Sequence, residues 1–130
     1  MAVLCAQRWV IQYLLRLLEQ RGFKADQLET SGLVGRREDG SFYERFRNRL
    51  MIPIARDNGA IVAFGGRALE EGQVPKYLNS PETPIYTKGR TLYGLDKTKQ
   101  AIRTRNYVVL VEGYFDFAQV WQSGVQNVVA

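Results

Sequence analysis

The pattern of hydrophobic and polar positions is clearest at the end of the chain. Residues 107–111 form an apolar run that ends at Glu112, and a helical pattern follows from about residue 115 to 123. A second apolar run occupies residues 127–130. Strand, turn, helix and strand in this order predict one βαβ unit with two parallel strands. Because both apolar runs are continuous rather than alternating, we expect a sheet that is covered on both faces.

Two helices are predicted near the start of the chain. Apolar residues recur at helical spacing from about residue 7 to 21, and Gly22 ends the pattern. The apolar stripe of this helix is typical of a face that packs against a core rather than against a partner. A shorter helix is predicted from Ala25 to Thr30, ending near Gly32.

A β-hairpin is predicted in the middle of the chain. Residues 50–56 and 60–67 have the composition of strands, and the Asp-Asn-Gly sequence at 57–59 favours a tight turn between them. Pro53 cannot donate a ladder hydrogen bond, so we expect the first strand to lie at an edge or to be bulged there. Two glycines at 65–66 indicate a bulge, or the close approach of another backbone or a ligand.

The remaining stretches complete the order of elements. Residues 36–41 form a polar turn, residues 76–79 a short strand, and two prolines at 81 and 84 bracket an irregular segment. Residues 95–105 form a helix that leads into the strand at 107. The predicted class is α+β: N-terminal helices, a basic part that contains an antiparallel hairpin, and then the βαβ unit.

The composition narrows the class of protein. With 130 residues, of which 45% are hydrophobic and 24% charged, the chain can form one core and part of another. A net charge of +5 favours an anionic partner, nucleic acid before an acidic membrane surface. The absence of histidine, and the single Cys5, exclude histidine catalysis, His-bearing zinc sites and an internal disulfide. No run approaches membrane-spanning length, so we expect a reduced, cytoplasmic setting and no membrane partner.

Basic residues gather in two spans of the sequence. One span is interleaved with three aromatic residues, Phe42, Tyr43 and Phe46, and holds Arg36, Arg37, Arg45, Arg47, Arg49 and Arg56. The other span holds Lys88, Arg90, Lys97, Lys99, Arg103 and Arg105. Arginine and lysine suit phosphate oxygens, and exposed aromatic rings can stack on unpaired bases. The alternative is a set of solvated surface charges, which we favour for the helix at 95–105.

Two acidic residues follow the first predicted parallel strand. Ligands of parallel sheets bind at the carboxyl ends of the strands, where Glu112 lies, and Gly113 keeps side-chain bulk away from it. A solvated carboxylate explains Glu112 equally well, so the chemistry of the residue alone leaves both interpretations open. Asp116 falls in the first turn of the following helix, where a negative charge suits the helix dipole.

Five blocks of the sequence resemble the bacterial replicative DNA primase family, the DnaG type. Residues 111–116 have the sequence VEGYFD, which is similar to the glutamate motif of the Toprim fold. They are joined by RFRNRLMIPI at 45–54, FGGR at 64–67, PKYLNSPET at 75–83 and KGRTLYGL at 88–95. The block at 75–83 is the most diagnostic. In order and approximate spacing the blocks resemble the primase polymerase core, over residues 9–130.

The resemblance implies a fold and an activity. It places a basic N-terminal subdomain of the primase core in residues 1–104 and an incomplete Toprim subdomain in residues 105–130. The parent enzyme would be a nucleotidyltransferase, a DNA-directed RNA polymerase that makes short RNA primers on single-stranded DNA during replication. It would use ribonucleoside triphosphates and Mg²⁺ or Mn²⁺, hold an RNA–DNA primer duplex, and contact the replicative helicase of the primosome through a domain outside this chain.

The resemblance also implies roles for single residues. Glu112 would be catalytic and would bind a divalent metal, with Asp116 as the nearby acidic candidate for the same incomplete site. We predict contacts with DNA or nucleotide at seven residues: Arg67, Lys76, Asn79, Lys88, Arg45, Arg47 and Arg49. From its residue type alone, Asn79 fits a turn equally well. Tyr77 and Tyr93 are expected to pack rather than to stack on bases.

The carboxylates that Toprim enzymes need are incomplete in this sequence. In the family, the glutamate works with an Asp-x-Asp motif on a later strand, and no such motif follows Asp116. Because the sequence also stops on an apolar strand, we expect a fragment that is inactive alone. Two alternatives stay open: another Toprim enzyme, a topoisomerase or nuclease, and a non-enzymatic nucleic-acid-binding module. The block at 75–83 has no reason to occur in a topoisomerase or nuclease.

Overall fold

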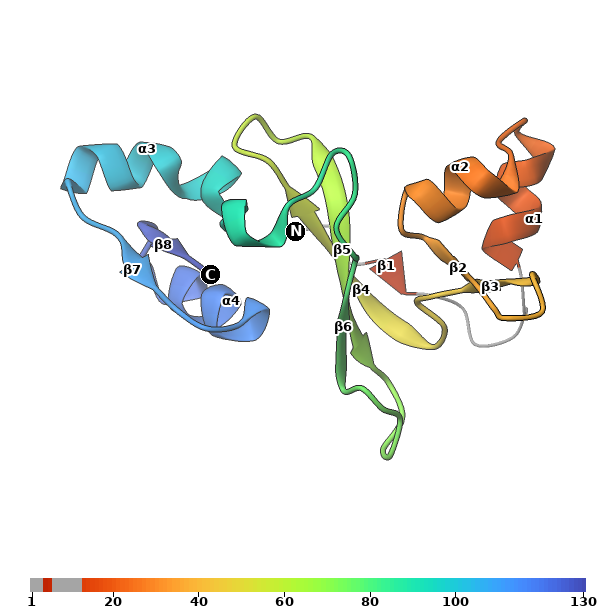
Figure 1. The fold of residues 1–130 in the computed structure, drawn as a ribbon. Coiled ribbons are helices and arrows are strands. Elements are labelled where there is room, and N and C mark those ends of the chain that lie inside the picture. Colours follow the sequence, from red (N-terminus) through yellow and green to blue (C-terminus); the bar gives the residue numbers. More distant parts are fainter. Residues whose placement is uncertain (1–3, 6–12) are drawn as a thin grey trace. The chain divides into compact units, whose positions relative to one another are not determined.

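The computed structural model describes residues 4–5 and 13–130 (Figure 1). The chain forms two compact units, one from residues up to 52 together with 63–88, the other from residues 53–62 and 89–130. Helices and strands are mixed in the α+β manner that the sequence predicts. None of the helices in the described residues is long and apolar enough to cross a membrane.

Two helices and a small hairpin form the first core. Helices α1 (Tyr13–Gln20) and α2 (Ala25–Thr30) contact each other, and α2 contacts strand β2 (Val34–Arg36). The buried side chains are Leu15, Leu28 and Val34, with Leu18 and Phe42 packed against them. The prediction for α2 is confirmed residue by residue. Residues 7–12 of the first predicted helix lie outside the described part of the chain.

The hairpin of β2 and β3 (Phe42–Glu44) was not predicted, because each strand has three residues. Residues 37–41, inside the predicted polar turn, connect them, and the Arg37 amide donates to the Ser41 carbonyl oxygen at 2.8 Å. Gly35 pairs with Tyr43 across the hairpin. A Cβ atom at Gly35 would lie 2.5 Å from the Tyr43 ring, so only glycine fits beneath this tyrosine.

The predicted central hairpin is part of a four-stranded sheet. The strand order is β1 (Leu4–Cys5), β4 (Arg49–Ala55), β5 (Ile61–Ala68) and β6 (Tyr77–Asn79). The turn between β4 and β5 is closed by the Arg56 amide on the Ala60 carbonyl oxygen at 2.9 Å. Strand β1 pairs with Leu50 and Met51, so in the described part of the sheet this edge of β4 is open at Pro53. The short strand predicted at 76–79 is confirmed as β6.

The second unit contains the predicted βαβ arrangement. Strand β7 (Val109–Leu110) lies parallel to β8 (Val128–Val129), with α4 (Tyr114–Gln122) between them in sequence. Helix α3 (Leu95–Arg105) has its predicted bounds and, like α4, contacts β8. The expectation of a sheet covered on both faces is wrong for β7: Leu110 is 71% exposed, whereas Val128 and Val129 are buried. Helices α3 and α4 supply the cover on β8, and β7 lacks it within the described residues.

Residues 89–104 pack in the same compact unit as β7 and β8. The sequence-based division places these residues in the N-terminal subdomain, 1–104, rather than with 105–130. The contact between α3 and β8 explains the difference, because a helix that precedes a strand can still form part of its core. The division into subdomains itself stays a prediction.

Candidate nucleic-acid surface and carboxylate site

Strands β5 and β6 bring two of the predicted contact residues, Arg67 and Asn79, together with Tyr77. The antiparallel register pairs Gly65 with Asn79, Gly66 with Leu78, and Arg67 with Tyr77. Side chains alternate between the two faces of a sheet, so Arg67, Tyr77 and Asn79 share one face, which we call the β5–β6 face. The Arg67 guanidinium carbon lies 6.0 Å from the centre of the Tyr77 ring. Tyr77, which was expected to pack, lies against Arg67 and is 45% exposed.

The opposite face of the same strands is filled by protein side chains. A Cβ atom at Gly66 would lie 2.9 Å from the Phe46 ring and 3.0 Å from Cδ of Arg49. The close approach that the glycine pair predicts is therefore confirmed at Gly66, and the approaching groups belong to residues 46–49. Phe46 is buried and meets Phe64 edge to face, with ring centres 6.5 Å apart. Base stacking by Phe46 is thus excluded in this structure.

Arg49 lies beneath the β5–β6 strands rather than on their surface. It is 3% exposed, and its Nη1 donates to the carbonyl oxygens of Gly66 and Lys76, both at 3.4 Å. Burial lowers the pKa of this guanidinium from its ordinary value. These contacts tie β4 to the start of β6. We therefore give Arg49 a supporting role and leave it out of the surface that we propose for DNA.

The other predicted cations differ in their exposure. Lys76 and Lys88 are exposed, and the Lys88 amide donates to a carboxylate oxygen of Glu82 at 2.9 Å. Arg47 is exposed, and its carbonyl oxygen accepts from Gln73 Nε2 at 3.0 Å. Arg45 is half-buried, and its Nε is a buried donor that meets no acceptor within the described residues.

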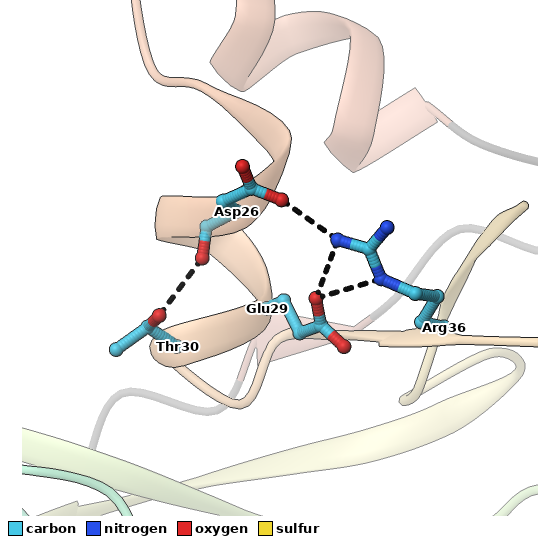
Figure 2. Close-up of polar contacts among 4 residues, drawn as sticks. All are labelled: Asp26, Glu29, Thr30 and Arg36. Carbon is cyan, nitrogen blue, oxygen red and sulfur yellow. Dashed lines mark hydrogen bonds and ion pairs between the residues drawn. The ribbon is translucent and has the colours of Figure 1, made fainter. Parts of the chain in front are cut away.

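Arg36 is neutralised by acidic residues of α2 (Figure 2). Its Nη2 lies 2.7 Å from Asp26 Oδ1 and 3.0 Å from Glu29 Oε2, and its Nε donates to the same Glu29 oxygen at 3.1 Å. The hydrogen bond with Glu29 is the largest cause that raises the pKa of this guanidinium. The guanidinium also lies 4.5 Å from the centre of the Phe42 ring. Arg36 thus links α2 to the hairpin and adds little to a phosphate-binding surface.

Glu112 lies in the turn between β7 and α4. The preceding residue, Val111, donates its amide to the Val129 carbonyl oxygen at 3.0 Å, and Gly113 is the N-cap of α4. Both Glu112 and Asp116 are exposed. Asp116 folds back toward the start of its helix, since its Oδ2 would lie 3.0 Å from a Cβ atom at Gly113. This position agrees with an interaction with the helix dipole.

Glu112 and Asp116 have the donor chemistry of a divalent metal site, but few neighbouring donors among the described residues. Their oxygen atoms are the hard donors that Mg²⁺ and Mn²⁺ prefer. Residues 4–5 and 13–130 nevertheless contain no group of three or more His, Cys, Asp or Glu side chains that could hold a metal ion. The donor chemistry therefore fits a divalent cation, whereas the number of donors does not complete a site.

Comparisons with known proteins agree with this arrangement. The family model of the DNA primase catalytic core, N-terminal domain, matches residues 6–99. The DNA primase of Listeria innocua is 48% identical over 113 residues, which are 87% of this chain and 18% of that protein. The DNA primase of Synechococcus elongatus is 50% identical over 115 residues, 88% of this chain and 16% of that protein. The chain thus spans less than a fifth of the length of these relatives.

Solved structures show the same similarity. The RNA polymerase domain of Mycobacterium tuberculosis primase DnaG superposes with a TM-score of 0.81 at 36% identity, covering 90% of this chain and 38% of that one. The Escherichia coli primase catalytic core gives 0.82 at 38% identity, with 93% and 38% covered. A DnaG primase catalytic domain bound to single-stranded DNA gives 0.82 at 36% identity, with 98% and 39% covered. The chain therefore belongs to the DNA primase family, in which it matches the N-terminal domain of the catalytic core.

Proposed function

We propose that this chain is the DNA-contacting part of a primase polymerase core and carries the first carboxylate of its metal site. The complete protein would be a cytoplasmic nucleotidyltransferase that makes short RNA primers on single-stranded DNA from ribonucleoside triphosphates. The observation that carries the proposal is the β5–β6 face, where Arg67, Tyr77 and Asn79 lie together. The exposed Lys76 directly precedes Tyr77 in the sequence. The similar catalytic domain bound to single-stranded DNA supports the same partner.

The chemistry of this face suits an unpaired nucleic-acid strand. A guanidinium and an ammonium group neutralise phosphate oxygens, and an exposed aromatic ring can stack on a base whatever its identity. Arg67 and Tyr77 share the face, so one strand of DNA could contact both at once. Lys88 and Arg47, which are also exposed, would add positive charge to the same compact unit. Tyr77 is added to the contact residues because of its exposure, which the sequence alone did not indicate.

Glu112 is the residue that we propose for the metal, with Asp116 as its candidate companion. A divalent ion bound there would neutralise charge on the transferring phosphate and activate the attacking hydroxyl. The chain contributes an exposed carboxylate held at the end of a parallel strand. The remaining ligands, like the contact with the replicative helicase, would come from other parts of the complete primase.

The first prediction concerns single-stranded DNA binding by the 130-residue chain. We expect Arg67→Ala and Lys76→Ala each to raise the Kd by about threefold to tenfold at low salt, because each change removes one cation from the phosphates. Lys99→Ala serves as the matched control, since Lys99 Nζ already donates to the Asp57 carbonyl oxygen at 2.6 Å. Fluorescence anisotropy with a labelled oligonucleotide, repeated at several salt concentrations, measures the effect.

The same measurement separates the proposed surface from a general attraction of charges. Binding should weaken as salt rises, and losing one phosphate contact should reduce the slope of log Kd against log salt by about 0.7. Equal losses from all three alanine variants would show that net charge, rather than the β5–β6 face, binds DNA. Binding that does not change with salt would contradict phosphate contacts altogether.

A second prediction concerns catalysis by the chain alone. We expect no template-dependent RNA product when the 130 residues are incubated with single-stranded DNA, ribonucleotides and Mg²⁺. The reason is that the described residues contain no group of three or more His, Cys, Asp or Glu side chains that could hold the metal ion. Radiolabelled nucleotide incorporation measures this, with a complete primase as positive control. RNA made by the isolated chain would show that its own residues complete the site.

A further inference from the structure

A buried aromatic cluster joins Tyr93, in the block at 88–95, to helix α4. Tyr93 is 8% exposed, and its ring meets Tyr114 edge to face with ring centres 4.8 Å apart. It meets Phe117 in the same way at 5.0 Å. Tyr114 is the first residue of α4 and follows Glu112 by two positions. Burial, followed by the charge of Asp96, raises the pKa of the Tyr93 phenol, which is therefore neutral.

The backbone of Tyr93 is fixed to the same end of the parallel pair. Its amide donates to the Ala130 carbonyl oxygen at 2.7 Å, and the Ala130 amide donates back to the Tyr93 carbonyl oxygen at 3.1 Å. The neighbouring Val129 carbonyl oxygen accepts the Val111 amide at 3.0 Å. Backbone hydrogen bonds thus connect Tyr93 to Ala130 at the end of β8, and connect Val129 of β8 to Val111, the residue before Glu112.

The start of α3 holds the Tyr93 ring against α4. Gly94 has a φ of +83° and lies so close to Phe117 that a Cβ atom would be 2.2 Å from its ring. The Gly94 carbonyl oxygen accepts the Thr98 amide and the Thr98 hydroxyl, both at 3.1 Å. Thr98 is fully buried. The start of α3 therefore fixes the backbone next to Tyr93, and with it the position of the ring that contacts α4.

We propose that Tyr93 is a positioning residue for Glu112. Glu112 is exposed, and the glycine that follows it has no side chain to fix the turn. The geometry of this turn therefore depends on what anchors its two sides: Val111 on β8, and Tyr114 with Phe117 on the ring of Tyr93. This inference rests on the proposed function of Glu112, because a misplaced carboxylate lowers the rate only where that carboxylate acts.

The test uses the complete primase with three changes in this segment. Tyr93→Leu should lower kcat for primer synthesis by about tenfold to a hundredfold and leave the KM for nucleotides and the Kd for DNA within about twofold, because small displacements of a catalytic group cost rate. Tyr93→Phe should keep kcat within about threefold, since it keeps the ring contacts with Tyr114 and Phe117. Ile102→Ala, in the far half of α3, is the control for lost packing and should leave kcat unchanged.

Hydrogen exchange of backbone amides in the 130-residue chain measures how often the turn around Glu112 opens, and it needs no metal or substrate. In Tyr93→Leu, the amides of Val111 and Phe117 should exchange about tenfold faster than in Ile102→Ala, since a local opening raises exchange only in the segment that opens. If Tyr93→Leu does not fold, Tyr114→Leu removes the same contact from its half-buried partner and should give the same results.

The outcomes separate this inference from the proposed function. Equal kcat values in Tyr93→Leu and Ile102→Ala, or a loss that Tyr93→Phe does not avoid, would overturn the role of Tyr93. Equal exchange in all variants would overturn it as well. Full activity of Glu112→Gln would instead refute the catalytic role of Glu112, and the exchange rates would still show whether Tyr93 anchors the turn.

Discussion

Gly94→Ala is expected to lower the free energy of unfolding by about 2–5 kcal/mol, the sum of a left-handed backbone and an overpacked core. Gly94 has a φ of +83°, which side chains other than glycine rarely adopt. A methyl group would also lie 2.2 Å from the ring of Phe117, which is 3% exposed and cannot turn away into solvent. Urea denaturation followed by circular dichroism measures the loss.

Gly72→Ala is a matched control for the backbone part of this effect. Gly72 has the same φ of +83°, but a Cβ atom there would meet nothing within 4 Å. We expect it to lower the free energy of unfolding by only about 1–2 kcal/mol, the cost of the left-handed conformation alone. Equal losses at the two glycines would show that the Phe117 ring moves aside without cost.

A double-mutant cycle isolates the contact between Gly94 and Phe117. Phe117→Leu removes the ring, so Gly94→Ala should cost less in that background than in the natural sequence. The coupling should be about 0.5–3 kcal/mol, the range found for residues in contact. Additive losses would contradict the steric explanation, even if Gly94→Ala alone destabilises the chain.

The elements that could be predicted from sequence have local signals. The Asp-Asn-Gly turn predicts the hairpin of β4 and β5, because glycine at 59 takes a φ of +87° without strain. Helix α3 has its predicted bounds because left-handed residues, Gly94 and Asn106, flank it at both ends. The βαβ unit follows from two apolar runs around a helical pattern.

The features that could not be predicted depend on contacts between distant residues. The β2–β3 hairpin has too few residues per strand for an alternating pattern, and its register is fixed by the Tyr43 ring over Gly35. Arg49 looks like its exposed neighbours in sequence, yet it is buried against the Gly66 backbone, 17 residues away. Charge and residue type alone cannot distinguish such an arginine from one that faces a phosphate.

The candidate sites were predictable to different extents. The pairing of β5 with β6 follows from two short strand patterns, but the register that places Arg67 beside Tyr77 required the structure. For Glu112, the apolar run before it predicted the end of a parallel strand, which the pairing of Leu110 with Val129 confirms. The sequence predicted that the Tyr93 ring packs, but its partners, Tyr114 and Phe117, could be identified only from the structure.

Glu112→Gln in the complete primase is expected to lower the rate of RNA primer synthesis by about a hundredfold or more, the usual effect of removing one charge-stabilising group. Glutamine keeps the shape of the side chain and removes the charge that a divalent cation needs. Glu38→Gln, in an exposed turn of the other unit, makes the same change in net charge and should have no effect on the rate. Primer yield over time, at saturating nucleotide and DNA, measures both.

Binding of Mn²⁺ decides whether this loss arises at the metal. The 130-residue chain should bind Mn²⁺ with a Kd on the order of millimolar or weaker, since the described residues supply at most two neighbouring carboxylates. A chain extended through the Asp-x-Asp strand that the resemblance implies should bind Mn²⁺ more tightly, and Glu112→Gln should remove that gain. In the short chain the same substitution should leave folding unchanged, because Glu112 is exposed at a strand end. Paramagnetic broadening measures Mn²⁺ binding by the short and the extended chain, each with and without Glu112→Gln. Tight binding by the short chain, or an unchanged Kd in the extended variant, would place the metal away from Glu112.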